Sequence, residues 1–319
     1  MKTNDQTPHA HPLQDPERRK LLKSMGWGGA GLLWTMKSGV LSAATLDAAT
    51  AGAGGADFSF VQISDSHIGF HQEANPHVLD TLQEAIGHVN GLATAPAFVL
   101  HTGDVSHLSK PEQFDAAQQA FKSIKTDSMF FTPGEHDTIG DSGAEFFKRF
   151  GLGSSGKGYY SFDYKGTHCL GLVNVLDFKP GGMTTLGDEQ LEWVEKDLKH
   201  LSSSTPILVF AHIPLWTVYE PWGWGTADAP RLYSYLRRFG SVTVLNGHIH
   251  QIQQKIEGNM TFYTARGTAY PQPQPGAAPS PGPLTVPAGQ LGSYLGIREI
   301  RQVNVKGPMA VTDTTLALG

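Results

Sequence analysis

Five short apolar segments, each followed at once by histidine or acidic residues, constrain the fold of this chain most. The segments cover residues 58–63, 97–101, 128–132, 206–211 and 241–245, and each has the length and composition of a buried strand. The clusters that follow them are Asp65-Ser66-His67, Gly103-Asp104, Gly134-Glu135-His136-Asp137, His212 and Gly247-His248-Ile249-His250. Because ligands gather at the carboxyl ends of strands in open α/β sheets, we expect the five clusters to meet at one edge.

The side chains in these clusters define a class of metal. Imidazoles and carboxylates together suit iron, zinc or manganese, whereas an all-oxygen set would suit calcium or magnesium. A thiolate site is excluded, because Cys169 is the only cysteine. A lone Asp-x-His or Gly-His-x-His is a weak signal, but all five clusters in order after apolar segments predict metal binding.

In this order the clusters resemble the signature of the calcineurin-like metallophosphoesterase superfamily, over residues 58–250. The resemblance implies two adjacent metal ions bridged by Asp104. It assigns the remaining ligands in two groups: Asp65, His67 and His250 on one ion, and His212 and His248 on the other. It also implies an α/β fold of two packed mixed β-sheets flanked by helices, an αββα sandwich.

One position departs from the family pattern. Most members have a neutral asparagine ligand where this chain has Glu135, a carboxylate that can bind a metal through one or both oxygens. The added negative charge supports two hypotheses. It favours a more highly charged ion such as ferric iron, or it reduces the Lewis acidity that the substrate experiences. The metal pair among iron, manganese and zinc therefore stays open.

The resemblance also implies a mechanism. Cleavage of a phosphate ester needs hydroxide, and metal binding lowers the pKa of water from near 15.7 to about 7, so a hydroxide bridging the two ions is the expected nucleophile. The leaving alcohol needs a proton, and His136 is the candidate general acid, with Asp137 as its orienting partner. For the nearby His71, His101 and His107, packing is the simpler interpretation and a contact to a ligand or substrate is the alternative.

These residues predict a binuclear metal-dependent phosphoesterase that hydrolyses phosphodiesters or phosphomonoesters, with diesters slightly preferred. The alternative is a non-catalytic periplasmic protein that binds metal or a partner on the same scaffold. Glu135 is the only feature that supports this alternative. An intact His136 and Asp137 argue against it, because a pure binding protein has no chemical need for them.

The first 56 residues are interpreted as an export signal and linker, followed by one catalytic domain at residues 57–319. Arg18 and Arg19 precede a glycine-rich, mildly hydrophobic stretch, which resembles a twin-arginine signal. Lys37 and the four glycines within residues 26–31 disfavour a membrane-spanning helix, so no stable membrane anchor is expected. We therefore predict recognition by the twin-arginine export machinery, cleavage between Ala43 and Ala56, and a periplasmic location.

The net charge of the predicted mature chain limits the class of substrate. Without residues 1–51 the chain has 18 Lys/Arg and 25 Asp/Glu, a formal charge of −7. This acidic balance disfavours a nucleic-acid polymer as partner, because such binding needs a broad basic surface. Small phosphate esters are the expected substrates.

The remaining segments complete the predicted sandwich. Apolar spacing near 3.6 predicts helices at residues 78–89, 114–124 and 191–201. Strand-like stretches at 159–164, 168–176, 251–257, 261–264 and 294–305 suggest the second sheet, although the strands alone also allow one doubly wound sheet.

Two predicted loops are candidate determinants of substrate specificity. The aromatic segment at residues 216–224 is expected either to form a wall beside the metals or to cover the sheet edge, with equal weight. The Pro-rich segment at residues 271–287 lacks periodicity and is predicted to be an extended surface loop.

Overall fold

The computed structural model describes residues 32–37, 40–45, 57–126, 128–151, 158–303 and 307–316. The predicted twin-arginine motif at Arg18 and Arg19 lies outside these residues, as does most of the predicted linker. Two strands before residue 57, β1 (Leu32–Lys37) and β2 (Val40–Thr45), pair in antiparallel fashion. Within the described ranges, no helix is long and apolar enough to cross a membrane.

The first sheet has five strands in the order β13-β12-β3-β4-β5. Their bounds are β3 (Phe58–Ile63), β4 (Val99–His101), β5 (Met129–Phe131), β12 (Gly296–Gln302) and β13 (Ala310–Thr315). The strands β3, β4 and β5 are parallel, and β12 runs antiparallel to both β3 and β13. Every residue of β3, β4 and β5 is buried, as expected for strands covered on both faces.

The second sheet has six strands in the order β10-β11-β9-β8-β7-β6. Their bounds are β6 (Tyr160–Tyr164), β7 (Thr167–Gly171), β8 (Ile207–Phe210), β9 (Val242–Asn246), β10 (Gln253–Glu257) and β11 (Met260–Thr264). The four central strands are parallel, whereas β6 and β10 pair with their neighbours in antiparallel fashion.

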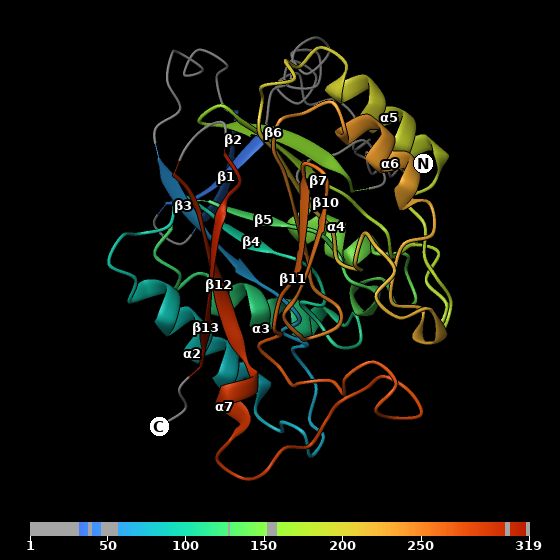
Figure 1. Ribbon diagram of the computed structural model, residues 1–319. Helices are drawn as coiled ribbons and strands as arrows, with labels where there is room; N and C mark the ends of the chain where they lie inside the picture. The colour runs from blue at the N-terminus through green and yellow to red at the C-terminus, as the bar shows by residue number, and fades with distance from the viewer. Residues whose placement is uncertain are drawn as a thin grey trace, which may run out of the picture.

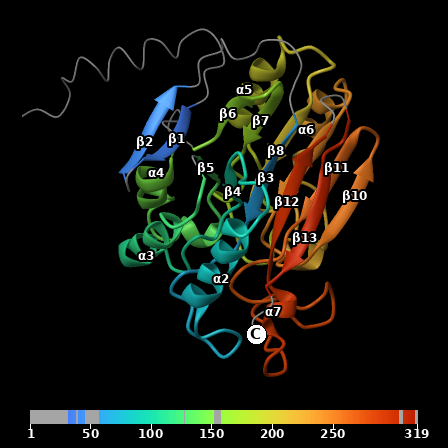
Figure 2. The ribbon, with the colours of Figure 1, turned by 90° about the vertical axis from the view of Figure 1, so that its left-hand side faces the viewer.

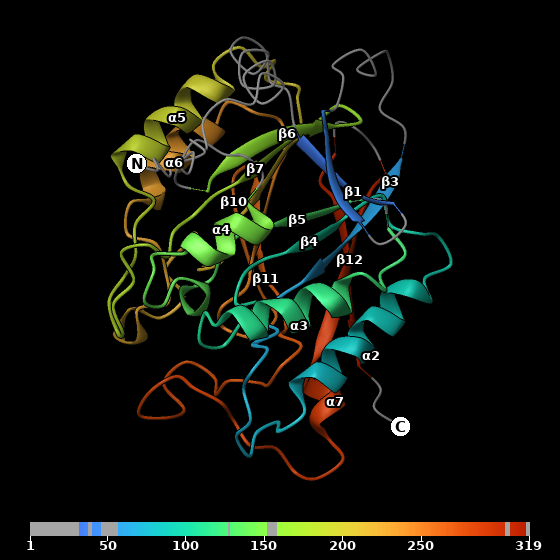
Figure 3. The same cartoon turned by 180° about the vertical axis from the view of Figure 1, so that it is seen from behind.

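Helices cover the outer faces of both sheets (Figure 1, Figure 2). The first sheet is covered by α2 (Val78–Asn90), α3 (Pro111–Phe121), α4 (Ala144–Phe150) and the short α7 (Leu291–Tyr294). Figure 3 shows α2 and α3 lying across this sheet from behind. The second sheet packs against α5 (Asp188–Leu198) and α6 (Ala229–Leu236).

A third apolar cluster lies between the two sheets and contains Phe60, Phe98, Phe130 and Phe210. Neighbouring residues of one strand alternate between clusters, since Phe60 faces the second sheet and Val61 faces the helices. The predicted αββα sandwich is therefore confirmed, and the single doubly wound sheet is excluded.

One part of the predicted topology is wrong. The segment at 294–305 was expected in the second sheet, but β12 pairs with β3 in the first sheet. The motif strands are also divided, because β3, β4 and β5 belong to the first sheet and β8 and β9 to the second. Strand pairing depends on contacts between distant segments, which the apolar pattern of each strand does not encode.

Candidate metal centre

All seven predicted ligand side chains meet where the two sheets present their strand ends. Around His67, the Nε2 atom lies 3.3 Å from Nε2 of His250 and 3.4 Å from Oδ2 of Asp104. His250 Nε2 also lies 3.3 Å from Oδ1 of Asp65. Asp65, His67 and His250 therefore form one group of converging donors.

The second group surrounds Glu135. Its Oε2 lies 3.0 Å from Nε2 of His212, and its Oε1 lies 3.0 Å from Nδ1 of His248. His212 Nε2 also lies 3.3 Å from Oδ2 of Asp104. The same carboxylate oxygen of Asp104 therefore faces both groups, which is the position required of a bridging ligand. The side chains fall into the two groups that the family resemblance implies, and their role as metal ligands stays a prediction.

Unpartnered polar atoms show that this arrangement fits cations. Glu135 Oε2, His212 Nε2 and His248 Nδ1 are buried without a hydrogen-bond partner among the described residues. His212 donates its Nδ1 proton to the carbonyl of Thr102 at 2.6 Å, and His250 donates its own to the carbonyl of Tyr270. When these imidazoles are neutral, as metal binding requires, each Nε2 is left with a bare lone pair. Buried lone pairs that face one another are unfavourable unless a positive ion lies between them.

The backbone of the ligand residues is strained. Eight described non-glycine residues have positive φ, and five of them are predicted ligands: Asp65, His67, Asp104, His248 and His250. Such left-handed conformations are costly for these residue types and concentrate at functional sites. Hydrogen bonds hold them in place, including His67 N–H to the Asp104 carbonyl at 2.8 Å and His248 N–H to Asp65 Oδ1 at 3.0 Å.

Glycine precedes three of the ligand clusters because there is no room for a side chain. A Cβ on Gly134 would lie 2.0 Å from Oδ1 of Asp104. A Cβ on Gly103, whose φ is +97°, would lie 2.4 Å from Nδ1 of His212. The glycines of the sequence motifs therefore allow the loops to approach the central carboxylate and imidazole.

Electrostatics keep the carboxylates ionised. Burial raises the pKa of Asp65, but His250 and His212 outweigh it and lower the pKa to about 2. The pKa of Glu135 is likewise lowered well below its ordinary value, because His248 and His212 overcome the effect of burial. Together with Asp104, the site therefore contains three carboxylates. Two divalent cations would offset their negative charge.

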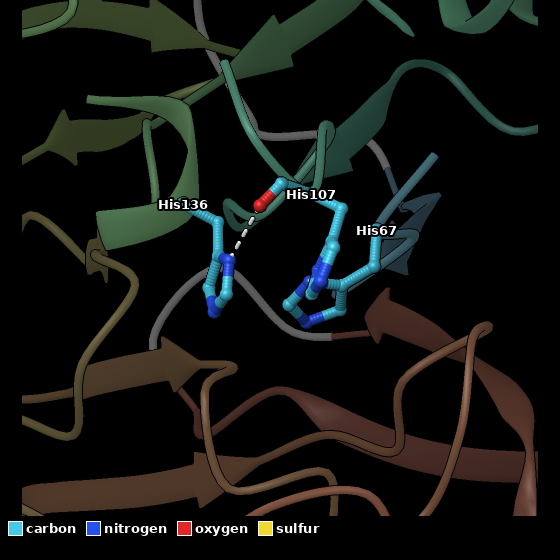
Figure 4. A group of neighbouring side chains, drawn as sticks. All are labelled: His67, His107 and His136. Carbon is cyan, nitrogen blue, oxygen red and sulfur yellow. Dashed lines mark hydrogen bonds between the residues drawn. The ribbon is translucent and has the colours of Figure 1, made fainter. Parts of the chain in front are cut away.

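His136 stands at the side of the site with one nitrogen free. Its Nδ1 donates to the carbonyl of His107 at 2.7 Å (Figure 4), which leaves Nε2 available. Burial opposes protonation of this imidazole, but Asp104 and Glu135 outweigh it and raise the pKa of His136. A protonated imidazole with a free Nε2–H can serve as a general acid.

Asp137 was expected to orient His136 and raise its basicity; its charge helps to raise the pKa of His136, but its carboxylate hydrogen-bonds to backbone groups instead of the imidazole. It accepts hydrogen bonds from the backbone N–H groups of Val105, Ser106 and Gly134, at 3.0, 2.7 and 3.0 Å. Asp137 therefore ties the turn that carries Glu135 and His136, η2 (Glu135–Asp137), to the loop after β4. The orienting partner of His136 is a backbone carbonyl, which has no signature in the sequence.

The three neighbouring histidines have different places. His107 stacks on His136 with ring centroids 4.9 Å apart, and its Nδ1 lies 3.4 Å from Nδ1 of His67 (Figure 4). His101 is fully buried with Nε2 2.9 Å from Ser66 Oγ, as the packing interpretation predicted. His71 is exposed. Only His107 adjoins the site.

Four of the predicted ligands, His67, Asp104, Glu135 and His248, line a cavity of about 450 Å³. Its walls are Phe70, Phe178, Trp222, Trp224, Tyr270 and residues 279–283. From the aromatic segment, Trp222 and Trp224 line this cavity, whereas Trp216 packs in the core under α6. The Pro-rich segment was predicted as a surface loop, and the structure additionally makes part of it a wall of the cavity.

Comparisons with known proteins agree with this site. The chain is 23% identical over 216 residues to a "probable glycerophosphodiester phosphodiesterase" of Arcobacter nitrofigilis, covering 66% of this chain and 78% of the relative. It is 28% identical over 185 residues to a serine/threonine-protein phosphatase of Danio rerio, covering 53% of this chain and 59% of the relative.

Among solved structures, a purple acid phosphatase from yellow lupin has a TM-score of 0.63 at 14% identity. The alignment covers 83% of this chain and 52% of the lupin chain, so it supports the fold alone. The calcineurin-like phosphoesterase family model matches residues 58–252, which include every predicted ligand. This chain therefore belongs to the calcineurin-like phosphoesterase family of metal-dependent phosphoester hydrolases.

Proposed function

We propose that this protein is an exported binuclear phosphoesterase that hydrolyses small phosphodiesters. The observation that carries the proposal is the pair of ligand groups that share the carboxylate of Asp104, with the free Nε2 of His136 beside them. Sequence similarity to a phosphodiesterase supports the substrate class, and similarity to a protein phosphatase makes phosphomonoesters the second candidate.

The chain's own residues have three tasks in this reaction. Asp65, His67 and His250 would hold one cation, Glu135, His212 and His248 would hold the other, and the carboxylate of Asp104 faces both groups. Two cations held there would make water nucleophilic at neutral pH and would offset charge on the phosphoryl oxygens. His136 protonates the leaving alcohol through Nε2, while the His107 carbonyl fixes its Nδ1–H.

The first experiment compares hydrolysis of bis-p-nitrophenyl phosphate and p-nitrophenyl phosphate by purified protein loaded separately with manganese, iron or zinc. We expect the diester to be hydrolysed faster. Activity on the monoester alone would identify a phosphatase instead. Two bound ions per chain without any hydrolysis would favour the non-catalytic alternative.

The second experiment tests the general acid. We expect His136→Ala to keep both metals and to lose activity on alkyl diesters by about 10² to 10⁴-fold, with a much smaller loss on nitrophenyl esters, which need no proton. The matched control is His200→Ala, which removes an exposed imidazole outside the cavity. Equal losses on alkyl and nitrophenyl esters would contradict the assignment.

Export is tested separately, because the signal lies in residues that the structure does not describe. Cells producing Arg18→Lys/Arg19→Lys protein should retain it in the cytoplasm, whereas the unaltered chain should be recovered from the periplasm in shortened form. Equal recovery of both proteins from the periplasm would exclude the twin-arginine route.

A further inference from the structure

The Pro-rich segment is uncharged and lies beside the predicted metal site. Seven of the 17 residues from 271 to 287 are proline, and residues 267–297 contain no charged side chain. Residues 279–283 of this segment line the cavity above the ligands. The segment is the orange loop in the lower part of Figure 1.

Hydrogen bonds fix this segment to the turn that carries two ligands. Gln272 donates from Nε2 to the carbonyl of His248 at 2.7 Å, and its Oε1 accepts the N–H of Gly282 at 3.2 Å. Gln251, next to His250, donates to the carbonyl of Pro273 at 2.7 Å. Proline fixes its own φ, so the prolines at 279, 281 and 283 together with these hydrogen bonds restrict the conformation of residues 279–283.

The opposite wall of the cavity is aromatic. Phe178 is half-buried, and its ring centroid lies 6.4 Å from that of His248; Trp224 approaches the same imidazole at 6.4 Å. Among the described residues that line the cavity, Asp104 and Glu135 are the only charged side chains apart from the histidines. Lys179 is exposed and is not among the lining residues.

This lining discriminates between phosphate esters by charge. A phosphomonoester brings a second negative charge, and beyond the two cations and the imidazoles no Lys or Arg in the described lining can compensate for it. Burying a charge without a partner is unfavourable, whereas an apolar group gains from contact with proline and aromatic rings. A singly charged diester with an uncharged organic group matches the cavity best.

We propose that residues 279–283 and Phe178 form a preformed, uncharged subsite for the alcohol group of a monoanionic phosphodiester. The preferred substrates carry an aromatic or other apolar alcohol. Gln272 is a positioning residue, since it holds the proline wall against the ligand turn. The inference rests on the proposed phosphodiesterase function and names the substrate class of that site.

The test uses two diesters with the same leaving group, phenyl p-nitrophenyl phosphate and ethyl p-nitrophenyl phosphate. We expect the protein to prefer the phenyl diester in kcat/KM by about tenfold or more, the range given by one or two extra apolar groups in a pocket. Phe178→Ala and Gln272→Ala should each reduce this preference to within about threefold. Changes in metal loading or active fraction affect both substrates equally and cancel in the ratio.

Gln274→Ala is the matched control, because Gln274 is an exposed glutamine of the same segment that does not line the cavity. Its phenyl-to-ethyl ratio should equal that of the unaltered protein. A diester that bears a carboxylate on the phenyl ring should be a poorer substrate than the phenyl diester by about tenfold or more.

The outcomes separate this subsite from the proposed function. Diester hydrolysis with an unchanged phenyl-to-ethyl ratio in Phe178→Ala and Gln272→Ala would overturn the subsite and leave the phosphodiesterase function standing. Equal rates on the phenyl and carboxyphenyl diesters would also overturn it. Failure to hydrolyse any diester with any metal would refute the proposed function, and the subsite with it.

Discussion

Deprotonation of His168 is expected to weaken the fold at alkaline pH. His168 is buried in β7, and its two ring nitrogens lie 2.8 Å from Asp163 Oδ1 and 2.7 Å from Asp197 Oδ2. An imidazole with a carboxylate at each nitrogen carries both protons and is therefore a cation. These contacts connect β7 with the edge strand β6 and with α5 on the outer face of the second sheet.

The pKa of His168 shows how much its protonation stabilises the folded state. Burial lowers it, but the hydrogen bonds to Asp163 and Asp197 outweigh burial and raise the pKa from 6.5 to about 9. At about 1.4 kcal/mol per pKa unit, protonation of His168 favours the folded state by about 3 kcal/mol. Because Asp163 is half exposed and water screens its contact, the expected range is about 2–3 kcal/mol.

The direction of the pKa shift of His168 determines whether the free energy of unfolding rises or falls with pH. The folded pKa lies above the unfolded value, so the contribution is complete below pH 6.5 and is lost as the pH rises through about 9. The free energy of unfolding, measured by urea titration in chelator, should fall over this interval by about 2–3 kcal/mol more in the unaltered protein than in His168→Gln. The melting temperature should show a relative shift of about 5–10 °C.

The control is His200→Gln, which replaces an exposed histidine and should follow the unaltered protein at every pH. Other groups that titrate at alkaline pH are present in both proteins and cancel in the difference. A difference between the unaltered protein and His168→Gln that stays constant from acid to alkaline pH would refute the reasoning.

Three further changes test the metal site and the packing of the sheets. Glu135→Asn removes one of three carboxylates, so the ion mixture measured by elemental analysis should shift from ferric iron towards divalent ions; unchanged metal content and turnover would mean that Glu135 is not a ligand. Gly134→Ala places a Cβ 2.0 Å from the bridging carboxylate and should abolish tight binding of two ions, whereas Gly87→Ala, with open space around it, should leave metal content unaltered. Arg298→Met removes a buried guanidinium that contacts Asp313 at 2.8 and 3.0 Å and donates to the carbonyl of Thr264; because Asp313 is exposed, the free energy of unfolding should fall by about 1–3 kcal/mol. Adding Asp313→Asn should restore the part of that loss that comes from the ion pair, and no recovery would contradict the ion-pair explanation.

The ligands of the candidate site could be predicted from the sequence because each one directly follows a strand. A short apolar run bounded by Asp65 or His212 identifies both the strand and its end. The atoms that orient the ligands could not be predicted in this way. The carbonyls of Thr102, Tyr270 and His107 accept hydrogen bonds from imidazole N–H groups, and every residue type has a carbonyl.

Two expectations were wrong because the contacts involved are not determined by the neighbouring sequence. Asp137 is adjacent to His136 in sequence, yet the tight turn of η2 directs its carboxylate to the backbone of the loop after β4. The 294–305 segment has the composition of a strand, but its partner β3 lies more than 200 residues earlier. Adjacency in sequence therefore decided neither contact.

The sequence by itself determined where most strands lie along the chain and which residue types follow them, because these depend on local apolar patterns and residue chemistry. The αββα sandwich was implied by the family resemblance, since the strand pattern alone also allowed a single doubly wound sheet. Only the tertiary structure decided which strands pair, which group orients His136, and that the proline segment forms a wall of the cavity. The physical reason is the separation along the sequence over which each interaction acts. Burial patterns and ligand chemistry act over a few neighbouring residues, whereas pairing, hydrogen-bond direction and cavity shape depend on contacts that form only when distant segments meet.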